Sequence, residues 1–282
     1  MSTGDIQLKL EELPDQLSKL IVATIADHTV AFLRVESNAS SEGSAYLIGS
    51  GVLVQAAEFR VILTAHHVME RVEPALLAGR LGILLGPTGQ IPNLGRADIF
   101  CNKIARGTDE RSGPDLALVM LAPGVAGSIA AKKRFYNLNL DQEGQMSATS
   151  PAIAEGVWVA QGFLDEKTVE SEEDMYKSFF NFSALGRPDH TPKIDEFDYF
   201  EFTVSEAGQK NSPLEWGGMS GGGLWQVPLS NVNNELVPGR PKLSGMIFYQ
   251  WFPGGKQPCS IRCHGRESVR DIAYRAIVNG GY

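Results

Sequence analysis

The segment Gly218-Met219-Ser220-Gly221-Gly222-Gly223-Leu224 places one serine in a backbone made almost entirely of glycine. Glycine adopts positive φ and tolerates close approach by other groups, so such a loop can turn its amide N–H groups inward around the serine hydroxyl. Acyl transfer needs this combination of a nucleophile and adjacent donors that stabilise an oxyanion. A glycine-rich turn with an incidental serine has the same pattern, and the rest of the chain has to decide between the two.

A nucleophilic serine also needs a base and a group that orients the base. The chain has five histidines, and two of them end the run Val61-Ile62-Leu63-Thr64-Ala65-His66-His67. The apolar residues of this run predict a buried strand that enters a turn, where a packed scaffold can hold a general base. Asp115 opens a second apolar run behind Gly113-Pro114. The chain order of the three groups is therefore His, Asp, Ser.

Together these segments resemble the chymotrypsin-like (trypsin-like) serine peptidases. Four motifs occur in the family's order, with 48 residues from His67 to Asp115 and 105 from Asp115 to Ser220. The motifs are Gly49-Ser50-Gly51, similar to Gly-x-Gly; Thr64-Ala65-His66-His67, similar to Thr-Ala-x-His; Asp115-Leu116-Ala117-Leu118, similar to Asp-(Ile/Leu)-Ala-Leu; and Gly218-Met219-Ser220-Gly221-Gly222, similar to Gly-Asp-Ser-Gly-Gly. The resemblance covers roughly residues 29–250 and is closest in style to intracellular bacterial members.

The resemblance implies a role for each matching residue. His67 matches the base, Asp115 the carboxylate that fixes the imidazole tautomer, and Ser220 the nucleophile. The backbone N–H groups of Gly218 and Ser220 match the oxyanion hole. A mechanism of this kind needs no cofactor and no metal, and its substrate is a protein or peptide.

The implied fold is all-β, with two six-stranded antiparallel β-barrels, a short N-terminal helix and a C-terminal helix. We expect an N-terminal helical flank over 1–28, a first barrel over 29–122 with His67 and Asp115, and an inter-barrel crossing over 123–150. The second barrel, with Ser220, is expected over 151–265 and the C-terminal helix over 266–282.

Two positions depart from the family pattern. Met219 replaces the aspartate that precedes the serine, so activation by a new N-terminal amine is not expected. His66 adds an imidazole beside the base; we interpret it as a supporting or pocket-rim residue, and an exchange of roles with His67 is the alternative.

Composition excludes several classes of partner. A net charge of −8 disfavours nucleic acid and anionic membrane surfaces, and no apolar stretch is long enough for a transmembrane helix. Three cysteines are few beside the disulfide-rich secreted members of the family, which favours the reducing cytoplasm. Cys259, Cys263 and His264 offer only three close metal ligands, so we interpret this segment as a surface loop with free thiols and predict no metal.

The resemblance also indicates a specificity pocket. Its floor lies six residues before the serine, at Leu214, and its wall at Phe248-Tyr249-Gln250. These residues favour an apolar or aromatic side chain at the cleaved position. A one-residue shift of the loop would put Glu215 at the floor and favour Arg or Lys instead.

The leading hypothesis is a cytoplasmic serine endopeptidase that processes a specific partner. An activating or regulatory protein partner is also compatible with this hypothesis. A catalytically silent, protease-like binding module is one alternative. An α/β-hydrolase esterase is another, although that fold orders its triad Ser, Asp or Glu, His.

Overall fold

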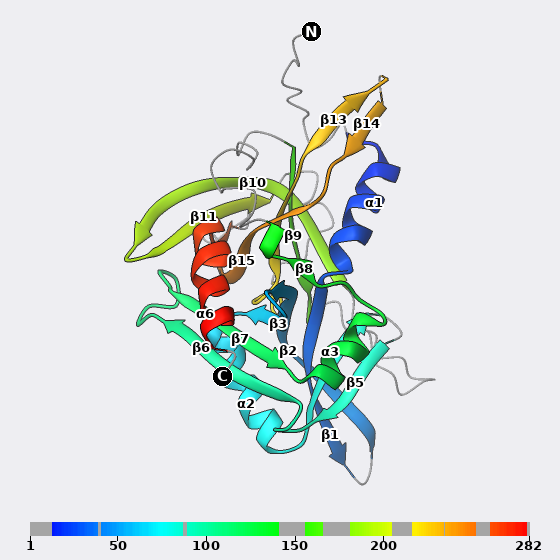
Figure 1. The fold of residues 1–282 in the computed structure, drawn as a ribbon, viewed down its shortest axis with the longest axis vertical. Coiled ribbons are helices and arrows are strands. Elements are labelled where there is room, and N and C mark those ends of the chain that lie inside the picture. The colour runs from blue at the N-terminus through cyan, green and yellow to red at the C-terminus, as the bar shows by residue number, and fades with distance from the viewer. Residues whose placement is uncertain are drawn as a thin grey trace.

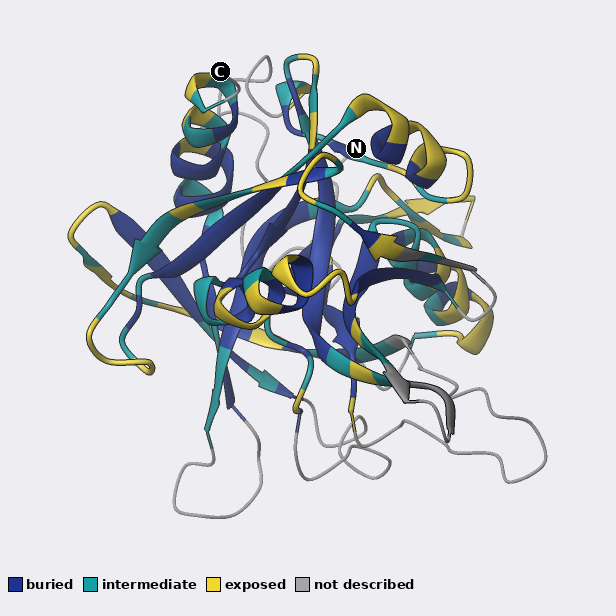
Figure 2. Ribbon diagram, turned by 90° about the horizontal axis from the view of Figure 1, so that it is seen from below, coloured by how far each residue is buried: buried dark blue, intermediate teal, exposed yellow. Residues whose placement is uncertain are grey.

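The computed structural model describes residues 13–38, 41–86, 89–140, 156–165, 181–204, 216–233, 235–251 and 260–280 (Figure 1). Two β-structures follow each other along the chain, and helices lie outside them. Strands at the centre are mostly buried, whereas the outward faces of the helices are exposed (Figure 2). No described helix is long and apolar enough to cross a membrane.

Helix α1 (Asp15–Ala26) precedes the first structure along the chain and starts directly after Pro14. Leu17, Ile21 and Ile25 recur every fourth residue and are buried on one face. The strands of this unit form one curled sheet in the order β5-β4-β1-β2-β3-β7-β6, and β8 pairs with β2. They are β1 (Thr29–Asn38), β2 (Ser41–Ala56), β3 (Phe59–Thr64), β4 (Leu81–Gly86), β5 (Gly89–Leu94), β6 (Ile99–Arg106), β7 (Asp115–Leu121) and β8 (Tyr136–Asn137).

The second structure is a closed six-stranded barrel in the order β10-β11-β16-β15-β12-β9. Its pairings are antiparallel throughout, so the mixed sheet that the α/β-hydrolase alternative requires is not formed. The strands are β9 (Val157–Phe163), β10 (Asn181–Ile194), β11 (Phe197–Val204), β12 (Gly223–Val227), β15 (Lys242–Trp251) and β16 (Ser260–His264). A separate hairpin joins β13 (Leu229–Val232) to β14 (Glu235–Pro238).

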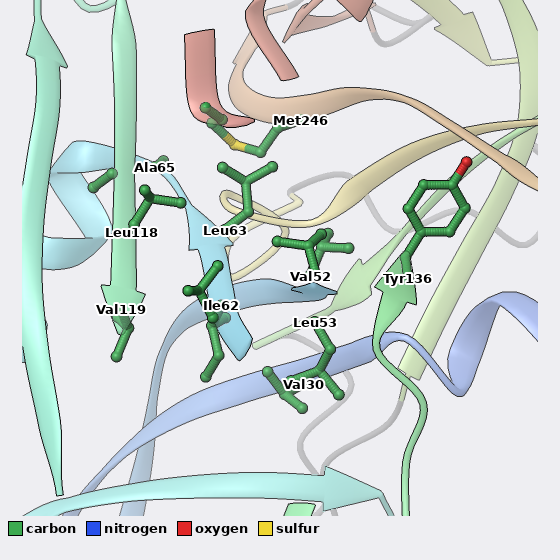
Figure 3. Close-up of a cluster of buried hydrophobic side chains, with 14 of the residues drawn as sticks. Val30, Val52, Leu53, Ile62, Leu63, Ala65, Leu118, Val119, Tyr136 and Met246 are labelled. Carbon is green, nitrogen blue, oxygen red and sulfur yellow. The ribbon is translucent and has the colours of Figure 1, made fainter. Parts of the chain in front are cut away.

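One hydrophobic core connects the two units. It contains Val52 and Leu63 of the first sheet together with Met246 of β15. In Figure 3 the Met246 side chain lies beside Leu63 and Val52. The chain ends in a π-helical turn η3 (Ser268–Ala273) and helix α6 (Tyr274–Asn279), whose Ile277 also joins this core.

The predicted all-β, two-unit architecture with helices at both ends is confirmed, with two differences. In the described residues the first unit is a curled sheet with free edges at β5 and β6 rather than a closed barrel. The segment expected to be a surface loop ends in β16, a buried strand that closes the second barrel, with Cys263 and His264 both inaccessible to solvent. The stretch from 123 also contains helix α3 (Pro123–Ala130) and strand β8.

Candidate functional site

A histidine and an aspartate meet where β3 gives way to helix α2 (His66–Leu77). His67 Nδ1 lies 2.6 Å from Asp115 Oδ2, and the backbone N–H of His67 donates to Asp115 Oδ1 at 3.0 Å. An ionised carboxylate only accepts hydrogen bonds, so in the neutral imidazole Nδ1 carries the proton and Nε2 has the lone pair. Asp115 also satisfies one of the free N–H groups at the start of α2, where the helix dipole favours negative charge.

The register of the sheet explains why these two residues meet. Thr64 of β3 pairs with Ala117 of β7, so the end of one strand lies beside the start of the other. His67 follows Thr64 in the first turn of α2, and Asp115 is the first residue of β7. The side chain of Asp115 is 2% exposed and that of His67 is 26% exposed, so the carboxylate is buried and the imidazole reaches the surface.

Two further side chains hold Asp115. Arg106 Nη1 donates to Asp115 Oδ2 at 2.9 Å, and the backbone N–H of Asp115 donates to His264 Nε2 at 3.0 Å. Burial alone would raise the pKa of the Asp115 carboxyl, but the hydrogen bonds from His67 and the charges of His67 and Arg106 outweigh it and hold this pKa below its usual value. The carboxylate is thus kept ionised in a buried position.

Ser220 lies in two successive backbone turns. Met219 N–H donates to Trp216 O at 3.0 Å and Gly222 N–H to Met219 O at 2.8 Å. The third residue of each turn is a glycine with positive φ, Gly218 at 92° and Gly221 at 87°. A type II turn requires positive φ at this position, which accounts for the glycines on both sides of the serine.

Hydrogen bonds to the carbonyl oxygens of Gly217 and Met219 fix the orientation of the peptide groups that precede Gly218 and Ser220. Gly217 O accepts from Asp165 N–H at 2.9 Å, and Met219 O accepts from Gly222 N–H at 2.8 Å. Because a trans peptide is planar, the N–H groups of Gly218 and Ser220 point away from these partners. Neither N–H donates to another residue that the structure describes.

Ser50 joins the serine turn to the first sheet. Its backbone N–H donates to Ser220 O at 2.8 Å, and its hydroxyl donates to Gly218 O at 2.7 Å and accepts from Phe163 N–H at 2.8 Å. The neighbouring Gly49 lies in the narrow space between the serine turn and helix α2. A methyl group added at Gly49 would lie 2.7 Å from Val68 Cγ2 and 3.2 Å from Ser220 O. The serine turn therefore packs directly beside the start of the helix that carries His67.

The Ser220 hydroxyl makes no hydrogen bond to His67 in the described structure. Its Oγ lies 3.5 Å from Phe248 O, at the limit of a hydrogen bond. The three predicted residues are brought to one junction between the units, with the His–Asp pair formed and the Ser–His contact open. Such contacts are often long without a bound substrate.

His66 points away from this junction. Its Nδ1 lies 3.1 Å from Ala105 O and its Nε2 lies 3.8 Å from Glu70 Oε1. The first contact is to β6 and the second lies within α2, so His66 supports the neighbouring strand, and His67 is the imidazole that is paired with Asp115.

Several of the predicted pocket residues lie elsewhere or outside the described residues. Leu214 and Glu215 fall outside the described residues. Phe248 is 2% exposed, and its ring packs 4.9 Å from the His264 ring and 5.9 Å from the Tyr199 ring. Its side chain thus belongs to the core behind Asp115, not to a pocket wall, because β15 shifts register between Ile247 and Tyr249. Tyr249 is half-buried, and Gln250 accepts from Trp216 N–H at 2.8 Å, beside the serine turn.

Four contributors to this site were missed or misread from the sequence. Arg106 had no motif around it, His264 was considered only as one of three close metal ligands, and Ser50 was only the middle residue of Gly-x-Gly. Met219 stands where the family pattern has aspartate, and its side chain is 1% exposed and fills the core of the second barrel, where it anchors the serine turn. Among the described residues no group of three metal-ligating side chains forms a metal site.

The closed barrel and the curled sheet, with the serine turn on one and the His–Asp pair on the other, form the mostly β, two-unit architecture that the resemblance to chymotrypsin-like peptidases predicts. No family model and no curated protein matches the chain. Similar solved structures include an HtrA-type protease with a decapeptide, at 12% identity and a TM-score of 0.47, covering 94% of this chain and 67% of that one. Others are the tobacco vein mottling virus protease (10%, TM-score 0.42, 92% and 82%) and a structure on aromatic interactions in folding and binding of the Sesbania mosaic virus VPg protein (15%, 0.43, 86% and 88%).

Proposed function

We propose that this protein is a serine endopeptidase that cleaves protein or peptide substrates through an acyl-enzyme on Ser220. The observation that carries the proposal is the fixed tautomer of His67. Its Nδ1 is bound to Asp115 at 2.6 Å, which leaves Nε2 as a base beside the docked serine turn.

In this mechanism His67 Nε2 takes the proton of Ser220 as its Oγ attacks the scissile carbonyl carbon. The N–H groups of Gly218 and Ser220 stabilise the oxyanion, and Asp115 stabilises the imidazolium that forms. His67 then gives its proton to the leaving amine. Water next attacks the acyl-enzyme, with His67 again as the base, and this step releases the acyl product and regenerates Ser220. The chain's own residues supply every group that these steps require.

The finer assignments belong to the same proposal. Tyr249 and Gln250 are proposed to line the acyl side of the substrate, with Leu214 at the floor and Glu215 as the alternative floor. A panel of fluorogenic peptides tests this, since cleavage only after Arg or Lys would reject the apolar floor. We also propose a regulatory role in a reducing cytoplasm, in keeping with the free thiols of Cys101 and Cys263.

The direct test is labelling with a fluorophosphonate, which reacts with an activated serine. We expect labelling of the natural protein and none of Ser220→Ala, with strongly reduced labelling of His67→Ala. Circular dichroism and thermal unfolding of both variants establish that they are folded. The proposal would be contradicted by a folded natural protein that the fluorophosphonate does not label, either alone or after addition of a cell lysate that supplies candidate activating partners.

One observation favours a second candidate, a catalytically silent binding module. The Ser220 hydroxyl lies toward Phe248 O and forms no hydrogen bond to His67 in the described structure. This candidate predicts peptide binding without labelling, and binding that survives in Ser220→Ala with unchanged affinity.

A further inference from the structure

A cavity of about 570 Å³ opens beside helix α2, which carries His67 in its first turn. One wall is formed by Arg71, Pro74, Ala75 and Ala78. These residues follow His67 by four, seven, eight and eleven positions, so they share its face of the helix. The facing wall comes from β1 and β2 and includes Leu47 and Ile48.

The cavity and the serine turn share one neighbour, Leu47. Leu47, which lines it, lies directly against Gly218, because a methyl group added at Gly218 would fall 2.3 Å from Leu47 Cδ2. One wall of the cavity is therefore in contact with the turn that presents Ser220, and the cavity extends along α2.

Chemistry assigns this direction to the leaving side of a substrate. A general acid must stand beside the amine that it protonates, so the leaving peptide has to lie on the His67 side of the serine. The cavity lies along the helix of His67, whereas β15 contacts the serine turn through Gln250 and Phe248 O, which leaves β15 for the acyl half.

The charges of the cavity are unbalanced. Glu36 pairs with Arg34 at 3.1 Å, and Glu70 is turned toward Arg106 and His66 at 3.5 and 3.8 Å. Arg71 and Arg80, by contrast, have no ion-pair partner among the residues that the structure describes. Two unpaired guanidinium groups thus face a cavity whose acidic groups already have partners.

We propose that this cavity binds the leaving side of the substrate and selects an acidic side chain through Arg71 and Arg80. The inference rests on the proposed peptidase function and specifies its substrate class. Four helical residues advance about 6 Å, and an extended peptide advances about 3.3 Å per residue. The guanidinium of Arg71 therefore meets the second or third residue after the scissile bond, and Arg80 meets residues beyond it.

The experiment uses peptides that share one acyl half and one cleavage site and differ only by Asp, Asn or Lys at the second and third leaving-side positions. We expect kcat/KM to fall in the order Asp, Asn, Lys, by about fivefold from Asp to Lys, since an exposed ion pair contributes little. Arg71→Glu reverses the order. Lys19→Glu, an equal charge change on the exposed face of α1, far from α2 in Figure 1, leaves it unchanged.

Two further measurements separate this inference from the proposed function. Fluorophosphonate labelling of Ser220 needs no leaving peptide, so Arg71→Glu should label at the natural rate. Polarisation of a labelled leaving-side peptide with Ser220→Ala measures binding without catalysis and should favour Asp over Lys. Normal labelling without any preference in cleavage or binding overturns the inference alone. Absent labelling overturns the function, and the binding preference then decides whether the cavity still selects acidic peptides.

Discussion

The two units hold their shares of the site in different ways. In the first sheet the His–Asp pair is formed by residues of one unit, and both oxygens of Asp115 are engaged by His67, with Arg106 as a second donor to Oδ2. From the second barrel, His264 accepts from the backbone N–H of Asp115. In the second barrel Ser220 is held by backbone turns and by Ser50 of the other unit, and its hydroxyl has only a 3.5 Å contact. The base is thus prepared locally, whereas the placement of the nucleophile depends on how the units pack.

The difference between the two units has an energetic basis. Asp115 is a buried charge, and a buried charge is tolerated only when its hydrogen bonds are complete. Both of its carboxylate oxygens therefore need hydrogen-bond donors. The serine turn is uncharged and depends on positive φ and close packing, which one methyl group can disturb. Changes in the first unit should affect chemistry, and changes at the contact should affect chemistry and stability together.

The largest expected effect is that of Asp115→Asn in the first unit. An amide presents its NH₂ or its carbonyl to His67 but no charge, so the imidazole loses its fixed tautomer and the imidazolium loses its counter-ion. We expect kcat to fall about 10⁴-fold with little change in KM. Steady-state kinetics on a fluorogenic peptide measure this, and a loss below tenfold would reject Asp115 as the orienting group.

The next effect is that of Gly218→Ala in the serine turn. Its φ of 92° disfavours a side chain, and the new methyl would meet Leu47 Cδ2 at 2.3 Å and Phe163 O at 2.9 Å. Movement of one oxyanion donor should lower kcat by about 10²–10³-fold and also destabilise the fold. Gly124→Ala in α3 is the matched control, because no atom lies within 4 Å of the added methyl, and it should leave kcat unchanged.

Ser50→Ala tests the contact between the units. It leaves Gly218 O and Phe163 N–H without their partner, and two buried unpaired groups cost about 3 kcal/mol of the free energy of unfolding. We expect a lower urea midpoint and a kcat/KM about tenfold lower, since the serine turn loses its anchor. Ser128→Ala, which removes an exposed hydroxyl bound to Gly124 O, should change neither quantity. Natural activity and stability in Ser50→Ala would show that the units dock without it.

The smallest effect concerns His264, which lies in the second barrel but binds the backbone of Asp115. Burial lowers the pKa of His264 from 6.5 to about 4. Between these values the unfolded chain binds the proton that the folded protein excludes, so stability is complete above pH 6.5 and falls as the pH drops toward 4. The loss between pH 7.5 and 5 is about 2 kcal/mol.

Urea unfolding at both pH values measures this loss. His264→Gln should be less stable at pH 7.5 and show a weaker decline toward pH 5, because the titrating group is gone. The lowered pKa of Asp115 acts in the same direction only at lower pH, as the carboxylate takes up its proton. An unchanged decline in His264→Gln would show that another group, such as the half-buried His28, dominates this range.

The sequence predicted most helices and strands because each is specified by the pattern of apolar residues within its own segment. The apolar run before His67 became β3, with Val61 to Thr64 all buried. The spacing of Leu17, Ile21 and Ile25 became the buried face of α1. Strand β16 was missed because it is only five residues long and its Cys263 and His264 were interpreted as part of a surface loop. Phe248 was misplaced because the register shift beside it depends on the pairing of β15 with β16.

The sequence by itself determined the chemical groups of the candidate site and the glycines of the serine turn, because turn geometry and the His67–Asp115–Ser220 order are written in short motifs. Only the tertiary structure decided that Arg106 and His264 hold Asp115, that Ser50 bridges the units and that Met219 is an anchor. These contacts join residues distant along the chain, such as Asp115 and His264, 149 positions apart. Such contacts arise from packing and strand register, and no local pattern specifies them.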